Sequence, residues 1–343
     1  MSQISQKEAP NNACMIIAGP CSIWHDSLPG IRDIARIQVS NRLTGERQRA
    51  IAGVRVVGLK SRTANDPTGE GMGIDFSVWR ENAEKLALYG STQHFEIPPS
   101  VIMAGRIFEQ TGLTIATEVC DPWIQLPPLA RVMGEGSVFV WGPSVQALGH
   151  HYATMGAFAK DRLGWTVGIK NPKWLGNKLE DTENKEFRGR TSMEATWEGL
   201  ASWTGLPSGR LVMIHRGVDV PDRGDYRNAP VHELARRVVE RTGIPMGFDP
   251  SHTFGPKKRG QIVEATVEAM SMRMPNGLPL YNRVLVEVEA GTKKTDVGQH
   301  ITQKELATMC EEIAKFRDLV PPEELSPRRP TVRREESEYK SYE

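Results

Sequence analysis

The sequence has few cysteines and no long apolar run. Its four cysteines, Cys14, Cys21, Cys120 and Cys310, are spread over 343 residues, which is not the density of a disulfide-stabilised secreted domain. No stretch of about 18 apolar residues occurs that could span a bilayer. The N-terminus also lacks the basic and apolar segments of a secretory signal. We therefore expect a cytoplasmic protein whose cysteines are reduced and can serve as metal ligands.

A large net charge is absent as well. The 43 Lys and Arg residues are balanced by 42 Asp and Glu residues, which leaves a formal net charge of +1. A strongly basic surface, of the kind that attracts nucleic acids or anionic membranes, is therefore not expected. The expected partners are small molecules, and any affinity for anions must come from a local cluster of basic residues.

Short apolar runs alternate with longer amphipathic segments along most of the chain. This alternation is typical of βαβ units around a parallel sheet. The runs are Cys14–Ala18, Val54–Leu59, Leu113–Thr117, Val138–Trp141, Thr166–Ile169, Leu211–Ile214, Pro245–Phe248 and Val284–Val288. Helical spacing of apolar residues occurs in Trp79–Tyr89, Val101–Gln110, Val231–Thr242, Gln261–Arg273 and Gln303–Leu319. Eight strands of this kind predict a single α/β domain, a (β/α)8 TIM barrel, rather than an open sheet.

The predicted barrel spans residues 13–320. Residues 1–12 are expected to be a flexible N-terminus. Residues 321–343 form a charged tail with few apolar residues, which we expect to be disordered or to dock on a partner subunit of a homo-oligomer. The segment from Lys173 to Arg210 is longer than a plain crossover and predicts a lid or an extra helix.

Polar side chains follow nearly every apolar run, at the positions where a barrel enzyme builds its active site. Four of them have the chemistry of metal ligands, although a lone cysteine or histidine at such a position is more often a buried structural residue. They are Cys21, His252, Glu287 and Asp296. A thiolate, an imidazole and two carboxylates together suit a divalent transition metal, namely Mn, Fe, Co or Zn, better than Mg.

Basic residues form a second group at the same end of the predicted barrel. They are Arg55, Lys60, Arg62, Lys170 and Arg216. Cations gathered in one cavity repel one another unless anions balance them. Glu118 and Asp249 can supply part of this balance. The remaining positive charge predicts substrates with more than one phosphate or carboxylate group, which Arg side chains bind with two N–H groups.

Eight motifs, in order, resemble those of the 3-deoxy-heptulosonate-7-phosphate (DAHP) synthases, whose superfamily includes the 3-deoxy-octulosonate-8-phosphate synthases. The similarity covers roughly Ala13 to Leu319. The motifs are GPCSI, RVVGLKSRT, ATEV, IKN, HRGV, DPSH, VEVE and TDVGQHIT. Each motif is weakly specific, but their shared order is strongly specific. The resemblance implies a TIM barrel that condenses phosphoenolpyruvate with an aldose phosphate.

The resemblance also implies residue roles. It makes Cys21, His252, Glu287 and Asp296 the metal ligands. It assigns phosphoenolpyruvate to Arg55, Lys60, Lys170 and Arg216, and the phosphate of the aldose to Arg62 and Thr63. The KSRT motif resembles that of DAHP synthases more than that of the octulosonate branch, which favours erythrose 4-phosphate as the acceptor. Glu118 and Ser144 are expected at the substrate site, and Lys60 and His215 are the expected proton carriers.

Two positions differ from the family pattern. The family commonly has Gly-Ala-Arg-Thr after the fourth strand, with an Arg that helps to bind phosphoenolpyruvate, but this chain has Gly142-Pro143-Ser144-Val145. Pro172 replaces the usual Gly after Lys170-Asn171. A neutral Ser144 hydroxyl binds phosphate more weakly than an Arg does.

In the implied reaction, the metal polarises the aldehyde, C3 of phosphoenolpyruvate attacks the aldehyde carbon, water adds at C2, and phosphate leaves by C–O cleavage. The missing Arg leaves two alternatives open. One is a phosphoenolpyruvate-dependent synthase that acts on another aldose. The other is a barrel that binds a metal or a phosphorylated metabolite but has lost catalysis.

Overall fold

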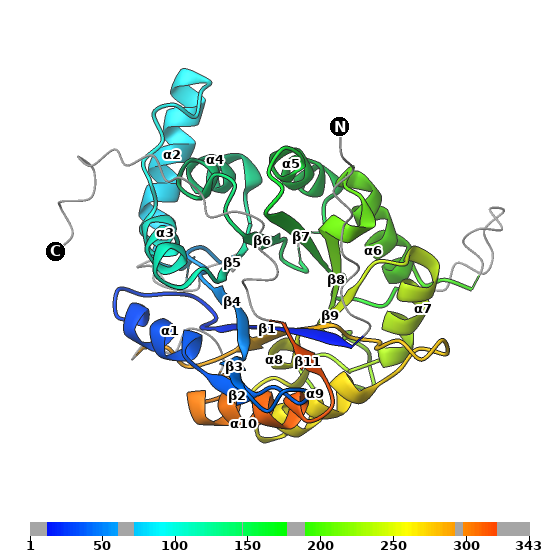
Figure 1. The fold of residues 1–343 in the computed structure, drawn as a ribbon. Coiled ribbons are helices and arrows are strands. Elements are labelled where there is room, and N and C mark those ends of the chain that lie inside the picture. The colour runs from blue at the N-terminus through cyan, green and yellow to red at the C-terminus, as the bar shows by residue number, and fades with distance from the viewer. Residues whose placement is uncertain (1–11, 61–71, 146, 177–188, 292–297, 321–343) are drawn as a thin grey trace, which may run out of the picture.

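Eight parallel strands close into a barrel in the computed structural model, which describes residues 12–60, 72–145, 147–176, 189–291 and 298–320 (Figure 1). The strands are β1 (Ala13–Gly19), β4 (Ile51–Arg55), β5 (Thr114–Glu118), β6 (Val138–Trp141), β7 (Trp165–Lys170), β8 (Leu211–His215), β9 (Met246–Phe248) and β10 (Arg283–Glu287). Each pairs with the next along the chain, and β10 pairs with β1. The predicted (β/α)8 barrel is confirmed.

Seven of the eight predicted apolar runs match strands closely, and the second is displaced. β4 begins at Ile51 and ends at Arg55, whereas the prediction began at Val54 and continued to Leu59. Val56 N still donates to Ala116 O of β5, and the chain then leaves the sheet, because Gly58 and Lys60 form backbone hydrogen bonds with Asp75 and Met72. The apolar run Val54–Leu59 therefore predicted the approximate position of β4 but not its first and last residues.

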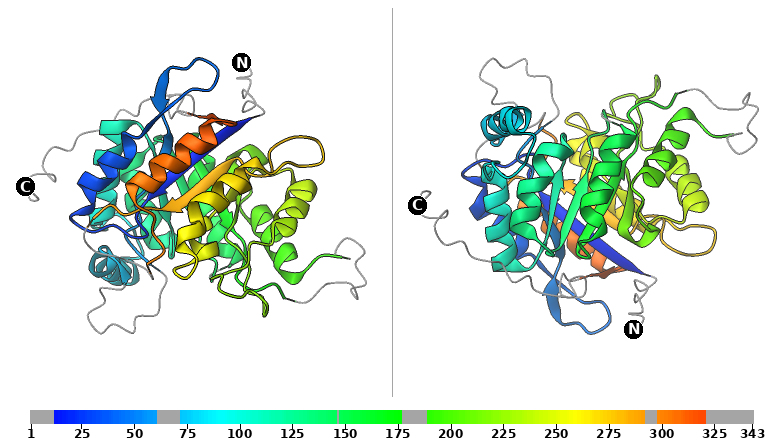
Figure 2. Two further views of the ribbon diagram at one scale, coloured as in Figure 1. Left: turned by 90° about the horizontal axis from the view of Figure 1, so that it is seen from below. Right: turned by 90° about the horizontal axis from the view of Figure 1, so that it is seen from above.

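Helices surround the barrel and cover the outer face of its strands (Figures 1 and 2). They are α1 (Ser27–Ala35), α2 (Phe76–Tyr89), α3 (Pro99–Thr111), α4 (Pro122–Met133), α5 (Gly149–Lys160), α6 (Ser192–Trp203), α7 (His232–Thr242), α8 (Pro250–Phe254), α9 (Ile262–Ser271) and α10 (Gln303–Ala314). Within the segment predicted as a lid or extra helix, α6 is the barrel's own helix after β7, and residues 177–188 lie outside the described residues.

The short elements depart most from the sequence predictions. A hairpin of β2 (Gln38–Ser40) and β3 (Arg47–Arg49) follows α1. The helix predicted to reach Leu319 ends at Ala314, because β11 (Asp318–Leu319) pairs with the start of β1. Short 3-10 turns occur at Ser208–Arg210 and Arg259–Gln261. The predicted tail, residues 321–343, lies outside the described part of the chain, as does nearly all of the predicted N-terminal segment.

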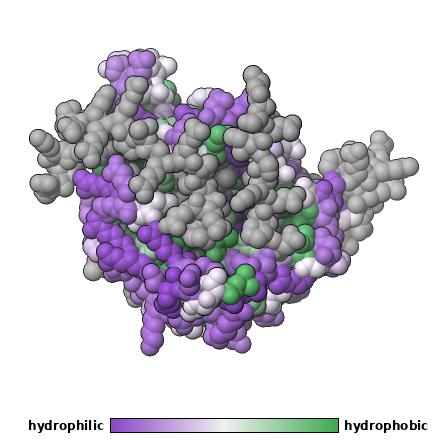
Figure 3. Space-filling view, viewed as in Figure 1, coloured by the Kyte–Doolittle hydropathy of each residue, from purple (hydrophilic) through white to green (hydrophobic). Residues whose placement is uncertain are grey.

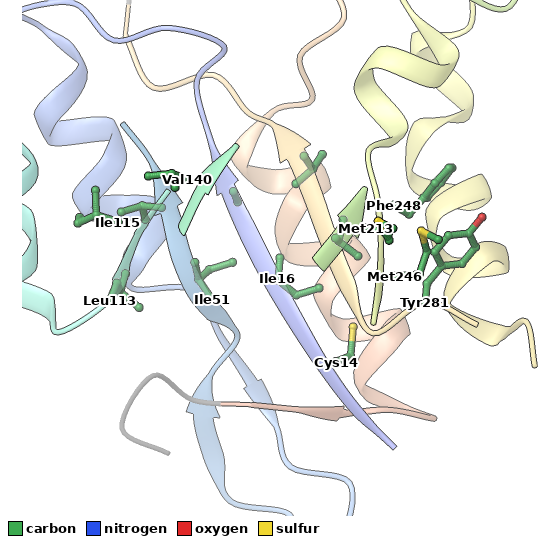
Figure 4. Close-up of a cluster of buried hydrophobic side chains, with 14 of the residues drawn as sticks. Cys14, Ile16, Ile51, Leu113, Ile115, Val140, Met213, Met246, Phe248 and Tyr281 are labelled. Carbon is green, nitrogen blue, oxygen red and sulfur yellow. The ribbon is translucent and has the colours of Figure 1, made fainter. Parts of the chain in front are cut away.

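Alternate residues of each strand face opposite sides, which divides the core in two. The larger cluster lies between strands and helices and includes Ile16, Met213, Phe248 and Tyr281 (Figure 4). The smaller one fills the barrel interior with Ile17, Val57, Ala116, Phe139, Trp141, Val212, Ile214 and Leu285. The barrel is therefore a packed core rather than a pore, and ligands must bind at its end.

Hydrophilic residues dominate the periphery of the face shown in Figure 3. This distribution follows from amphipathic helices that turn their apolar side to the strands. No helix among the described residues is long and apolar enough to cross a membrane.

Candidate functional site

Charged side chains gather where the strands end. Arg55, Glu118, Lys170 and Glu287 are the last residues of β4, β5, β7 and β10. Four further charged or ionisable residues follow strand ends directly or within a few positions: Lys60, Arg216, Asp249 and His252. All eight are buried. Because parallel strands end at one rim of a barrel, residues far apart in sequence meet there.

Ion pairs connect this cluster. Arg55 Nη2 lies 3.0 Å from Glu287 Oε1, and Lys60 Nζ lies 3.4 Å from Glu118 Oε1. Lys170 Nζ lies 3.1 Å from Asp249 Oδ2 and 3.8 Å from Glu118 Oε2. The structure thus joins residues of five different strand ends in one buried electrostatic network.

Basic residues outnumber carboxylates in the described part of this network. Arg55, Lys60, Lys170 and Arg216 face three carboxylates, those of Glu118, Asp249 and Glu287. Burial alone would raise the pKa of Glu118, but Lys60 and Lys170 outweigh burial and lower it to about 2. Burial lowers the pKa of Arg216 to about 10, so the guanidinium remains charged at neutral pH. An excess buried cation is costly unless an anion binds beside it.

Two polar groups of the site have unused hydrogen-bonding capacity. Among the described residues, Arg55 Nε and Nη1 and Ser144 Oγ are buried without a hydrogen-bond partner. Buried polar groups are normally satisfied, and an unpaired one costs about 1–3 kcal/mol. An anionic ligand with several oxygen atoms would satisfy these donors.

His252 and Glu287, two of the predicted metal ligands, lie close together. His252 Nδ1 lies 3.0 Å from Asp249 Oδ1, which orients the ring, and His252 Nε2 lies 3.7 Å from Glu287 Oε1. Burial lowers the pKa of His252, which favours the neutral imidazole. When Nδ1 donates its proton to Asp249, a nitrogen lone pair faces a carboxylate oxygen. A carboxylate that orients a ligating histidine in this way is common beside protein metal ions.

Cys21 is buried near the same network, since it raises the pKa values of Lys60 and Arg55 against the effect of burial. Among the described residues, no group of three or more His, Cys, Asp and Glu side chains is close enough to hold a metal ion. The fourth predicted ligand, Asp296, lies outside those residues. His252 and Glu287 nevertheless fit a divalent transition metal in donor chemistry and orientation.

His215 lies outside the cluster, which corrects the prediction that it carries a proton for the substrate. Its ring packs in the layer between strands and helices, where Nδ1 is 2.8 Å from Tyr281 Oη. Tyr281 Oη also contacts His232 Nδ1 at 2.7 Å. Burial lowers the pKa of His215 to about 3. The reason for the error is strand alternation: the next residue, Arg216, belongs to the charged network instead.

No protein-family model matches the sequence, and no curated protein matches it. Solved structures do match. One is the DAHP synthase (phospho-2-dehydro-3-deoxyheptonate aldolase) of Thermotoga maritima, with a TM-score of 0.59 and 15% identity over 89% of this chain and 69% of that chain. The chain has the fold of a DAHP synthase. A truncated form of 3-deoxy-D-arabino-heptulosonate 7-phosphate synthase from the same organism gives a TM-score of 0.57 and 16% identity over 89% of this chain and 87% of that chain.

The DAHP synthase fold was predicted, whereas two polar contacts of the site were not. Gln299 Nε2 donates to Glu287 Oε2 at 2.6 Å, and Arg227 Nη1 donates to Gln299 Oε1 at 2.5 Å. Gln299 therefore holds the carboxylate of a predicted metal ligand. Its position three residues after Asp296, inside the TDVGQHIT motif, was the signal available in the sequence.

Two residues that the DAHP synthase resemblance assigns to the aldose phosphate, Arg62 and Thr63, lie outside the described residues. The flanking backbone is described: Lys60 N donates to Met72 O at 2.8 Å, and Asp75 N donates to Gly58 O at 3.0 Å. These bonds join the two ends of the segment that carries KSRT. Lys60 is thereby held beside Glu118.

Proposed function

We propose that this protein condenses phosphoenolpyruvate with erythrose 4-phosphate to give 3-deoxy-D-arabino-heptulosonate 7-phosphate and phosphate. The observation that carries the proposal is the buried network at the strand ends, which has an excess of cations and unpaired Arg55 donors. Such a network suits a small polyanion and requires no nucleic acid or membrane. The DAHP synthase fold supports the reaction type.

Each substrate group has a proposed partner. Arg55, Lys60, Lys170 and Arg216 bind the carboxylate and phosphate of phosphoenolpyruvate. Ser144 adds a hydroxyl donor, and Glu118 holds Lys60 and Lys170 in place. Arg62 and Thr63 bind the phosphate of the aldose. Two polyanions repel each other, so a cationic site that holds both in a reactive orientation lowers the barrier by several kcal/mol.

Cys21, His252, Glu287 and Asp296 are the residues that would hold a divalent Mn, Fe, Co or Zn ion. When bound, such an ion acts as a Lewis acid toward the carbonyl oxygen of the aldose. Asp249 and Gln299 orient His252 and Glu287. His252 Nε2 and Glu287 Oε1, which these contacts leave 3.7 Å apart, are the donor atoms proposed to face the ion.

Lys60 is the proposed proton donor. Burial would lower the pKa of Lys60, but Cys21 and Glu118 raise it above its usual value, so the ammonium group keeps its proton until a stronger base appears. When C3 of phosphoenolpyruvate bonds to the aldehyde carbon, the carbonyl oxygen gains the electron pair and takes the proton from Lys60 Nζ. Water then adds at the electron-poor C2 and returns one proton to Lys60 Nζ. The C–O bond to phosphate breaks as the C2 carbonyl forms, and the leaving phosphate takes the electron pair and the remaining hydroxyl proton.

The decisive experiment measures phosphate release by metal-loaded protein supplied with both substrates. We expect release that requires phosphoenolpyruvate, erythrose 4-phosphate and metal together. Arg55→Lys, which keeps the charge but loses the planar fork, should abolish it. Arg283→Lys, at the opposite end of the barrel, is the matched control and should leave it intact.

A panel of aldose phosphates separates the alternatives. Faster turnover with another aldose would replace the proposed acceptor. Phosphoenolpyruvate binding without turnover on any aldose would favour a non-catalytic binding barrel. No binding of phosphoenolpyruvate at millimolar concentration in calorimetry would overturn the synthase proposal.

A further inference from the structure

An indole ring underlies the charged network. Trp141 is the last residue of β6, faces the barrel interior and is completely buried. Its ring centroid lies 5.6 Å from Arg55 Cζ and 5.5 Å from Lys170 Nζ. Its Nε1–H donates to Glu118 Oε2 at 3.2 Å. One side chain therefore contacts two cations and the carboxylate that pairs with Lys60 and Lys170.

These contacts restrict how Arg55 can turn. Nη2 is held by Glu287 at 3.0 Å, and the guanidinium carbon lies over the indole. With one nitrogen bonded and the carbon placed over the indole, rotation of the group is restricted. Nε and Nη1, which have no hydrogen-bond partner among the described residues, are then left available for a ligand. An Arg fork binds two oxygen atoms well only when its plane is oriented in advance.

We propose that Trp141 is a positioning residue for the phosphoenolpyruvate site, acting through Arg55 and Lys170. This inference rests on the proposed function. Trp141 directly precedes Gly142-Pro143-Ser144, where the family pattern has an additional Arg. A desolvated aromatic face stabilises cations without adding a charge of its own. In this chain Trp141 holds Arg55 and Lys170 in a geometry for binding and does not replace the missing positive charge.

The barrel interior is shaped around this residue. Trp141 pairs in register with Gly168 of β7, and a Cβ at Gly168 would lie 2.6 Å from Phe139 Cζ. Phe139 in turn lies 5.7 Å from Trp141, between ring centroids. Removal of the indole would therefore leave a void in a tightly filled interior and reduce stability. The test must separate this loss from a loss of binding.

Trp165 offers a matched control. It is also completely buried, its Nε1–H donates to Gly134 O at 3.0 Å, and Arg162 Cζ lies 5.5 Å from its ring centroid. It differs in position, because it begins β7 at the opposite end of the barrel. Leu at either position should destabilise the protein, but only Leu at position 141 should affect the ligand.

The experiment compares phosphoenolpyruvate dissociation constants of metal-loaded wild type, Trp141→Leu and Trp165→Leu by calorimetry. We expect Trp141→Leu to weaken binding about tenfold, the loss of a desolvated cation–π platform, with KM for the aldose phosphate unchanged. Trp165→Leu should retain the wild-type constant. Equal constants for wild type and Trp141→Leu would overturn the inference but leave the proposed function intact. A wild type that does not bind would overturn the proposed function.

A second variant covers the case in which Trp141→Leu fails to fold. Trp141→Phe keeps an aromatic face but loses the N–H and should bind phosphoenolpyruvate within about threefold of wild type. Its tryptophan emission should no longer change on binding, whereas that of Trp165→Phe should still change. Emission changes of equal size in both Phe variants would show that ligand binding does not affect the Trp141 indole by way of Arg55 and Lys170. That result would contradict the inference.

Discussion

Arg55 and Cys21 show how single residues of this site depend on partners distant in sequence. Arg55 pairs with Glu287, 232 residues away. Cys21 acts electrostatically on Lys60 and Arg55. Neither interaction is a property of the local sequence, so substitutions of Arg55 and Cys21 test the site and not the stability of one strand.

Cys21→Ser should weaken binding of transition metals and abolish turnover while the barrel remains folded. The reason is that a serine hydroxyl is a harder and weaker ligand than a thiolate. Metal content after dialysis, measured beside thermal unfolding, checks this. Cys120→Ser replaces another buried thiol that is not a proposed ligand and serves as control. Wild-type metal content in Cys21→Ser would remove this residue from the metal site.

Arg62→Ala should mainly raise KM for the aldose phosphate, by about tenfold or more, because it removes a guanidinium that can bind phosphate with two N–H groups. The metal and phosphoenolpyruvate affinities should not change. Steady-state kinetics with each substrate varied in turn measures the effect. Arg80→Ala on exposed α2 is the control. An unchanged KM would place the phosphate of the acceptor elsewhere.

At the scale of elements, α6 and α7 are joined through one buried carboxylate. Glu194 completes a capping box with Thr191 at the start of α6. It also accepts hydrogen bonds from Arg237 and Arg241 of α7 at 2.8–3.0 Å. Burial would raise the pKa of Glu194, but these arginines and Thr191 lower it to about 2. A single side chain therefore caps the start of α6 and binds the neighbouring helix α7.

Glu194→Gln should destabilise the protein by about 1–3 kcal/mol, because it weakens charge-assisted bonds and the cap together. The folded-state pKa lies below the unfolded value, so this stabilisation is present above about pH 4.5 and is lost as the pH falls toward 2. Urea titrations at pH 7 and pH 3 should show a smaller difference between wild type and variant at pH 3. Glu233→Gln, which breaks an exposed ion pair with Arg236, is the control. A pH-independent difference would contradict the assignment.

At the scale of the whole molecule, Arg317 links three chain segments at one end of the barrel. It is almost completely buried and donates to four backbone oxygens: Asn12 O at 3.0 Å, Ala13 O at 2.6 Å, Met270 O at 2.9 Å and Tyr281 O at 2.8 Å. These groups belong to the segments at the start of β1, at the end of α9 and before β10. Residues from both ends of the described chain meet there.

Arg317→Met should cost about 3 kcal/mol or more, because it leaves several buried carbonyl groups without donors. Activity per folded molecule should stay near that of wild type, since these contacts lie at the end of the barrel opposite the charged network. Denaturant unfolding and active-site titration together measure both effects. Arg36→Met, at an exposed ion pair, controls for the loss of a charge. A large drop in activity of the folded variant would show that barrel closure is coupled to the site.

The fold and most charged residues of the candidate site could be predicted from sequence, because the sequence signals for strands and for the polar residues after them are local. Strand length, alternation and the polar residues after each apolar run indicated a barrel and the end that carries the site. The prediction was wrong where side-chain direction decided the outcome, at His215, and where pairing decided an element's bounds, at β4 and β11.

The sequence by itself determined that parallel strands alternate with helices, and that Arg55, Lys60, Lys170, His252 and Glu287 come at or after strand ends. Only the tertiary structure decided which of these charges pair, that Trp141 lies beneath Arg55 and Lys170, and that Gln299 holds Glu287. The physical reason is that these contacts exist only after eight strands close. Closure brings together groups whose separation along the chain carries no information about their distance in space.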